Sequence, residues 1–131
     1  TITPAAPAKA SVDDIKKQLQ TAMFHAGELA QRGSAVAASK THMQHVMNCL
    51  EGTGGPNFVA AAGYPCQGMG SGILPDLRAA GDARGAAEAL RFASAAWTLV
   101  ASALRSNDVD EVQPYAKVVA AQLKLALDAL Q

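Results

Sequence analysis

The sequence is poor in aromatic residues, net charge and long apolar runs, and each shortage excludes a class of protein. Aromatic residues make up 5% of the 131 residues, too few for the stacking platforms that bind single-stranded nucleic acid. The 11 Lys and Arg balance the 11 Asp and Glu, which argues against nucleic acid or an anionic membrane as a partner. No apolar run reaches the about 20 residues that a membrane-spanning helix needs.

The motifs of common enzyme classes are also missing. There is no Gly-x-Ser-x-Gly, no Walker loop and no carboxylate pair that the sequence alone brings together. The glycines of residues 66–72, CQGMGSG, do not match the dinucleotide fingerprint and follow no strand. The chain has no C-x-x-C-H motif, which excludes covalently attached haem. We therefore predict no catalytic residues and expect that the protein is not an enzyme.

Abundant residues and their spacing favour helices. Alanine makes up about a fifth of the chain, far above average usage, and no strand-like alternation occurs. Apolar residues recur every three or four positions in four stretches, which predicts an antiparallel four-helix bundle as a single domain over residues 11–131. Residues 1–10 are expected to form a flexible tail. The predicted inner faces are Ile15, Leu19, Ala22, Ala26 and Leu29; Val36, Ser39, Met43, Val46, Met47 and Leu50; Leu90, Ala93, Trp97, Val100 and Leu104; and Val112, Ala116, Val119, Leu123, Ala126 and Leu130.

Local signals mark the ends of the first two helices. Ser11 followed by Asp14 is a capping-box-like start. Gly33 is suited to the left-handed cap that ends the first helix, and Ser34 is a good N-cap for the second.

The second half begins with a long connection. Residues 51–75 are rich in Gly and Pro and have no sustained periodicity, which is unusual in a compact domain unless the loop has a function. Asp76 or Asp82 is predicted to cap the third helix. Pro114 is either the first residue of the fourth helix or a kink inside it.

Two cysteines, Cys49 and Cys66, fit one disulfide in an oxidising compartment. The bridge would staple the loop between the second and third helices, although Cys49 as a free thiol ligand is the alternative. The chain starts at Thr1 with a Pro-rich run of small residues, as a mature protein does after signal-peptide removal. A start chosen for expression would look the same. We expect a periplasmic or secreted protein.

Residues 41–49, THMQHVMNC, concentrate the groups that bind metals. They hold two of the three histidines and two of the four methionines. In an antiparallel helix pair that turns near residue 33, residues whose numbers add up to about 66 lie level with each other. His25 is therefore expected beside His42, whereas His45 is expected further round the helix, on the outward side.

The predicted metal site is for copper or zinc. His42 and His45, three apart on one helix, can bind one ion, and His25 would supply a third imidazole. Thioethers of Met43 or Met47 would bias the site towards copper, because such ligands select Cu(I). Histidines on a helix flank are equally common without a ligand, and inner-face methionines are more often core fillers.

The stretch HxxHxxNC, followed by a Gly-rich loop and PCxGxG, resembles a pattern in small secreted bacterial helical proteins with no assigned activity. The resemblance covers residues 42–70 only. It implies secretion and a disulfide, and nothing about activity. The matching residues are His42, His45, Asn48, Cys49, Pro65, Cys66, Gly68 and Gly70.

Three functions stand as alternatives. The first is a small secreted metal-binding protein. The second is a non-covalent haem b or electron-transfer bundle with His25 or His42 as an axial ligand. The third is a cofactor-free module whose loop, residues 52–75, contacts a protein partner. Homodimerisation through alanine-rich faces is compatible with each of them.

Overall fold

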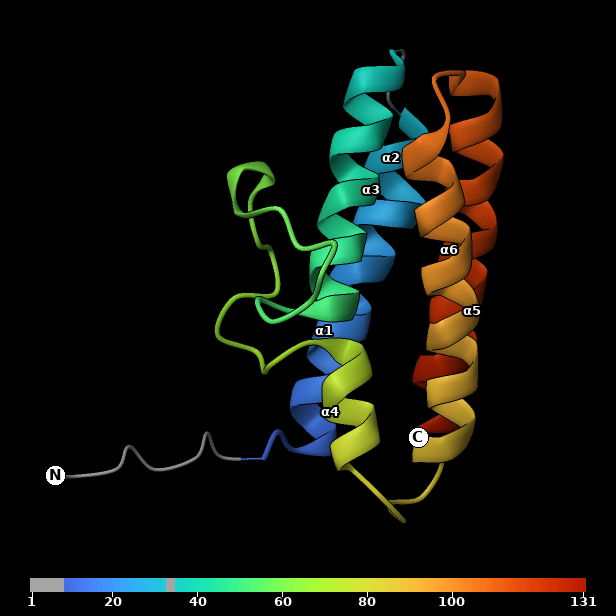
Figure 1. The fold of residues 1–131 in the computed structure, drawn as a ribbon. Helices are drawn as coiled ribbons and strands as arrows, with labels where there is room; N and C mark the ends of the chain where they lie inside the picture. Colours follow the sequence, from blue (N-terminus) through green and yellow to red (C-terminus); the bar gives the residue numbers. More distant parts are fainter. Residues whose placement is uncertain (1–8, 33–34) are drawn as a thin grey trace, which may run out of the picture.

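The computed structural model describes residues 9–32 and 35–131, and every regular element in these two ranges is helical (Figure 1). The all-α prediction is therefore confirmed. None of the helices in these ranges is both long and apolar enough to cross a bilayer. In chain order the elements are α1 (Val12–Phe24), the π-helical turn η1 (His25–Leu29), α2 (Ala30–Arg32), α3 (Val36–Glu51), the 3₁₀ turn η2 (Ala60–Ala62), α4 (Ile73–Ala79), α5 (Ala86–Arg105) and α6 (Val109–Ala129).

The helices stand side by side and alternate in direction. In Figure 1, α1, η1 and α2 form one column running up, and α3 returns beside it. The loop then swings out on the side of α3 away from α5 and α6 before α4 continues in the direction of α3. Helices α5 and α6 form the second antiparallel pair. The predicted count of four helices is not confirmed, because α4 is an additional short helix between the loop and α5 in the described chain.

The start of α1 follows the sequence prediction. The Ser11 hydroxyl accepts a hydrogen bond from the Asp14 N–H at 3.1 Å, and the Asp14 carboxylate accepts one from the Ser11 N–H at 3.2 Å. This reciprocal capping box pairs two backbone donors that have no partner inside the helix. The predicted cap residues Gly33 and Ser34 lie outside the described residues.

The predicted caps of the third helix are wrong. Asp76 lies within α4, Asp82 lies in the turn after it, and the N-cap of α5 is Gly85, with a φ of 77°. A side chain at Gly85 would collide with the carbonyl oxygen of Ala129. The beginning of α5 therefore packs directly on the end of α6, which no local cap signal announces.

Helix α6 begins at a side-chain cap and continues through a proline. Asp108 accepts a hydrogen bond from the Asp110 N–H at 2.9 Å. Pro114 lies inside the helix, so of the two alternatives the interior position is correct. Pro114 lies six residues after the Asp108 cap, beyond the first turn, so its ring removes one hydrogen-bond donor from the interior of the helix.

The inner face predicted for the last helix, α6, is confirmed. All its predicted inner residues are buried: Val112, Ala116, Val119, Leu123, Ala126 and Leu130. In α5 the buried residues are alanines and Val100, whereas Leu90, Trp97 and Leu104 of the predicted inner face are half-buried. Small side chains on the facing stripe let two helices approach closely, so alanine and not the larger residues faces inward.

In the first half of the chain the predicted inner faces are also buried, apart from Val36, which is half-buried; the side chain of Leu29 is not described. One buried contact there is polar. The Gln18 amide of α1 donates to the Asp76 carboxylate of α4 at 2.9 Å, and the Ser71 N–H donates to the same oxygen at 2.8 Å. Buried charges persist only when paired in this way, so Asp76 joins the loop, α1 and α4.

The predicted disulfide is confirmed. Cys49, near the end of α3, is bonded to Cys66 in the loop, with a Cα–Cα distance of 5.4 Å, and both residues are fully buried. The bridge closes 17 residues of chain. The loop itself is shorter than predicted, because Glu51 belongs to α3 and Ile73, Leu74 and Pro75 belong to α4.

Replacing both cysteines by alanine should lower the free energy of unfolding by about 3 kcal/mol, because the open chain gains entropy in the unfolded state. Urea denaturation monitored by circular dichroism measures this loss. The parent protein measured in a reducing buffer serves as a second sample and should lose stability similarly. A double variant as stable as the oxidised parent would contradict the structural role of the bridge.

Candidate metal centre

The three histidines converge at one point between the α1–η1 column and α3. The Nδ1 atom of His25 lies 3.3 Å from Nδ1 of His42 and 3.2 Å from Nδ1 of His45. The ring centroids lie 4.8 to 5.5 Å apart, and one nitrogen from each ring lies within 4.8 Å of the other two. This cluster could hold a metal ion. It is called the histidine triad below.

His25 reaches the triad from an irregular turn. It is the first residue of η1, and its carbonyl oxygen accepts a hydrogen bond from the Ala30 N–H, five residues on. A π-turn holds one residue more than an α-turn, and such turns occur disproportionately at functional sites. The periodicity of the sequence continues through this segment, so it gave no signal for the turn.

His45 has a fixed tautomer. Its Nε2 lies 2.5 Å from the carbonyl oxygen of Ala62 in η2. A carbonyl oxygen can only accept, so Nε2 carries the hydrogen and the neutral ring leaves Nδ1 as a free lone pair. Metal-binding histidines typically donate their second ring N–H to a carbonyl or carboxylate in this manner, which orients the ring. The contact therefore presents the ligating nitrogen of His45 to the triad.

Two rings of the triad, those of His25 and His42, favour the neutral form. Burial lowers the pKa of His25 to about 4, and repulsion from His45 and then His42 acts in the same direction. The pKa of His42 is also lowered, first by burial and then by His45. Metal ions bind the neutral form of imidazole, so these two rings are ready to bind at pH values where an exposed histidine is partly protonated.

The spacing of the nitrogens fits an ion better than it fits hydrogen bonds. Around an ion with tetrahedral nitrogen ligands at 2.0–2.1 Å, neighbouring nitrogens lie about 3.3–3.4 Å apart. Without an ion, Nδ1 of His45 has no hydrogen and must accept from His25. The one hydrogen on Nδ1 of His25 then lies between two acceptor nitrogens, Nδ1 of His42 and Nδ1 of His45. It can form a good hydrogen bond with only one of them.

Asn48 holds the part of the loop that lies over His45. Asn48, which is fully buried, donates to the carbonyl oxygens of Val59 at 2.9 Å and of Gly63 at 2.8 Å. Its own oxygen accepts from the Val59 N–H and the Gln44 amide, both at 3.0 Å. These contacts bracket Ala62, so Asn48 positions the carbonyl that orients His45.

The structure brings His25 and His42 together, as the register of the helix pair predicts. His45 was expected to point outward, which is wrong, because the loop folds over that flank of α3 and half-buries the ring. Met43 and Met47 are 0% and 1% exposed and belong to the hydrophobic core.

Sequence reasoning missed the roles of Asn48 and Ala62. Asn48 was noticed only as part of the HxxHxxNC pattern, one residue before the bridged Cys49. Ala62 contributes a backbone oxygen, which no side-chain pattern can reveal. The one available signal was the spacing of His45 and Asn48, three residues apart on one helix and therefore on one face.

Comparisons with known proteins add nothing to these observations. No protein-family model matches the chain, and neither a curated protein nor a solved structure does.

Stability without metal should fall as the pH drops from 6.5 towards 4. Unfolded His25 takes up a proton near its usual pKa of 6.5, whereas the folded protein resists until about 4, so the unfolded state binds more protons in this window. Urea midpoints measured in chelator at pH 7 and pH 4.5 test this. His25→Gln should show a smaller loss than the parent. Asp14 and Tyr64 titrate outside the window, since their pKa values are lowered from 3.8 and raised from 10.0.

Asn48→Asp should cost on the order of 3 kcal/mol of stability, because a carboxylate of the same shape cannot donate to the two carbonyl oxygens. Denaturant unfolding gives the cost, and amide hydrogen exchange should show faster exchange at residues 59–63. Asn107→Asp, in the exposed turn before α6, is the matched control and should change little. Equal losses in the two variants would contradict the role of Asn48.

Proposed function

We propose that this chain is a small secreted metal-binding protein whose histidine triad holds one Zn²⁺ or Cu²⁺ ion. The observation that carries the proposal is the pair of contacts from Nδ1 of His25, 3.3 and 3.2 Å from the nitrogens of the other two rings. Three imidazoles on one ion are a common protein site for zinc, and imidazole suits copper equally.

The choice of ion follows from the donors. In the described chain no Cys, Asp or Glu joins the group of three histidines, so the fourth position of a tetrahedral ion falls to water or an outside ligand. A set of three nitrogens favours the divalent ions. The sequence-based preference for Cu(I) depended on the thioethers of Met43 and Met47, which pack in the core.

The distances support a bare ion better than haem. Two nitrogens on opposite sides of one metal lie about 4 Å apart, twice the length of a metal–nitrogen bond. His25 and His42 are closer than that, with rings packed against each other at a centroid distance of 5.5 Å, so the porphyrin would have no slot between them.

Secretion is supported by the disulfide. The Cys49–Cys66 bridge is compatible with an extracytoplasmic compartment, where such bonds form and persist. A single His-rich site on a small stapled scaffold would there act to bind, carry or buffer the ion.

Metal binding is tested by replacing one ligand at a time. His25→Ala, His42→Ala and His45→Ala should each weaken Zn²⁺ and Cu²⁺ binding by about 100-fold or more, since loss even of a group that only orients a ligand costs 10–100-fold. Isothermal titration calorimetry at pH 7 on dialysed protein, with a competing chelator for tight binding, measures the affinities.

The matched control is Thr41→Ala, an exposed residue of α3 next to His42. It should bind as the parent does. The chain has three histidines in all, so binding that survives each single replacement would arise elsewhere and would refute the proposal.

A further inference from the structure

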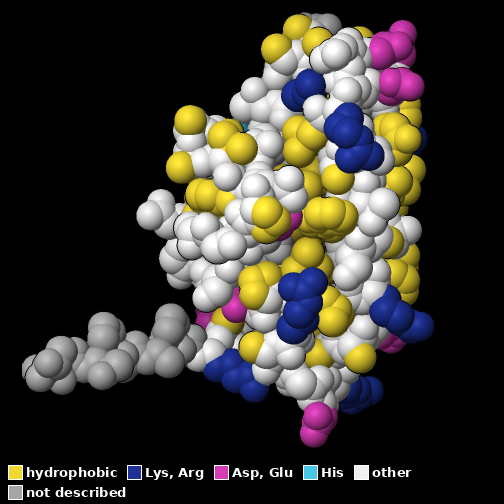
Figure 2. Space-filling model, in the orientation of Figure 1, with side chains coloured by type: hydrophobic (Ala, Val, Ile, Leu, Met, Phe, Trp, Pro, Cys, Tyr) yellow, Lys and Arg dark blue, Asp and Glu magenta, His cyan; other side chains and the backbone are white. Residues whose placement is uncertain are grey.

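A cavity lies away from the histidine triad, and none of the three histidines lines it. It has a volume of about 780 Å³ and is lined by the end of α3, the first turn of the loop, α4 and the middle of α5. Cavities of this size are typical of small-molecule sites. In Figure 2 hydrophobic side chains gather around the hollow between the loop and the α5 side of the molecule, and basic atoms lie directly below it.

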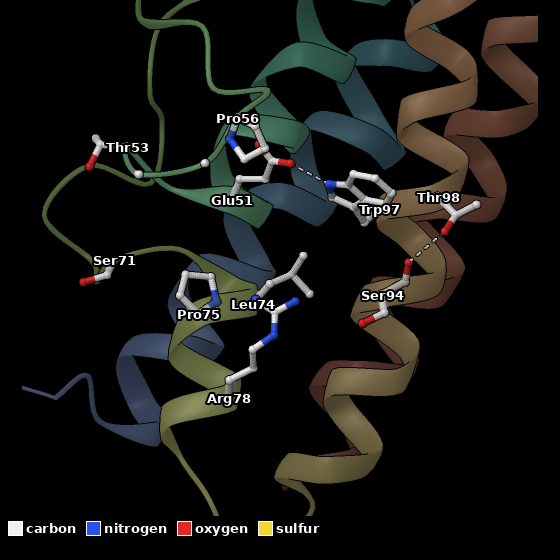
Figure 3. Close-up of a pocket in the computed structure, with 12 residues that line it drawn as sticks. Glu51, Thr53, Pro56, Ser71, Leu74, Pro75, Arg78, Ser94, Trp97 and Thr98 are labelled. Carbon is white, nitrogen blue, oxygen red and sulfur yellow. Dashed lines mark hydrogen bonds between the residues drawn. The ribbon is translucent and has the colours of Figure 1, made fainter.

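One wall of this cavity is built and held rigid. The indole N–H of Trp97 donates to the Glu51 carboxylate at 2.7 Å (Figure 3). Asn57 donates its backbone N–H and its amide to the same carboxylate at 2.7 and 2.8 Å. Glu51 is 8% exposed, and these three donors pair its carboxylate. The carboxylate thereby holds the indole ring in place.

The opposite side carries a cation with no partner. Arg78 is exposed at the cavity edge, and no hydrogen bond or ion pair engages its guanidinium among the described residues. Figure 3 shows the group beside Leu74, extending from α4 towards the gap in front of α5. It is the one Lys or Arg that lines the cavity. Five N–H donors in a planar fork match a carboxylate or a phosphate, either of which can accept two parallel hydrogen bonds.

The surfaces between these two groups are apolar. Leu74 and Pro75 of α4 face the cavity with Pro56 of the loop, and Trp97 closes the far side. Hydroxyl groups of Ser71, Ser94 and Thr98 stand at the margin. An occupant should therefore combine one negative charge with a flat or branched apolar body.

We infer that this cavity binds a small organic acid, its carboxylate paired with Arg78 and its apolar body packed against Trp97, Leu74 and Pro75. The site is independent of the histidine triad, so it stands whether or not the triad binds metal. A single guanidinium at the edge and an apolar interior select one carboxylate attached to an apolar body. A doubly charged or wholly polar anion would leave charge facing Leu74 and Pro75 unpaired.

The protein carries its own reporter for this site. Trp97 is the sole tryptophan of the chain, so intrinsic fluorescence excited at the red edge of the indole band reports this cavity alone. Three probes separate the two halves of the ligand: phenylacetate has both the charge and the body, phenylacetamide has the body without the charge, and acetate has the charge without the body. Chelator in every sample keeps the triad free of metal.

Phenylacetate should change the Trp97 emission saturably. Phenylacetamide lacks the charge-assisted contact and acetate lacks the buried ring, so each should need at least about tenfold higher concentration for the same change. Arg78→Gln should weaken phenylacetate by about tenfold and remove its advantage over phenylacetamide. Arg84→Gln, an exposed arginine outside the cavity lining, is the matched control and should bind as the parent does.

Three outcomes would overturn the inference. They are equal binding of phenylacetamide and phenylacetate, unchanged phenylacetate binding in Arg78→Gln, and no saturable signal with phenylacetate by either fluorescence or calorimetry. Because the Arg78 side chain is exposed and unpaired, Arg78→Gln should fold normally, and circular dichroism checks this directly.

Discussion

The structure on the triad side depends on the pairing of one buried amide, that of Asn48. A long loop covers the flank of α3, and its backbone donors and acceptors lose water there. Unpaired, each such group would cost 1–3 kcal/mol. Asn48 pairs two carbonyl oxygens and one N–H of the loop while remaining part of the helix. The loop can therefore lie against α3, and the carbonyl of Ala62 meets His45. Without this pairing the flank would be open to solvent and His45 would point outward, as periodicity alone suggests.

Helices and core were predictable to the extent that a single period governs them. In α6 every predicted inner residue is buried, because a heptad-like pattern on a helix paired with one partner has a single way to face inward. In α5 the pattern contained two candidate stripes, one of alanines and one with Leu90 and Trp97. Choosing between them requires knowing how closely α6 approaches, which is a property of the pair of helices. Helix α4 was missed for a related reason, since Ile73–Ala79 is too short to show a period.

The site was predictable where it depended on register and unpredictable where it depended on the loop. His25 and His42 meet because an antiparallel pair with a short turn has a definite register, and that follows from residue numbers. The inward turn of His45, the π-turn at His25 and the carbonyl of Ala62 arise from backbone geometry, which leaves no trace in residue spacing. The cavity beside Trp97 could not be predicted from residue spacing either. Glu51 and Trp97 are 46 residues apart in the chain, and nothing local connects them.

The position of the disulfide also bears on the donor groups that surround the triad. Cys49 lies one helical turn beyond His45, at the separation where side chains of a helix become neighbours. A free thiolate at this position would be an anionic donor one helical turn from His45. Bonded to each other, the two sulfurs are withdrawn from coordination. The closed bridge therefore leaves no free thiolate on this side of α3, and the imidazole nitrogens are the side-chain donors that the described chain brings together there.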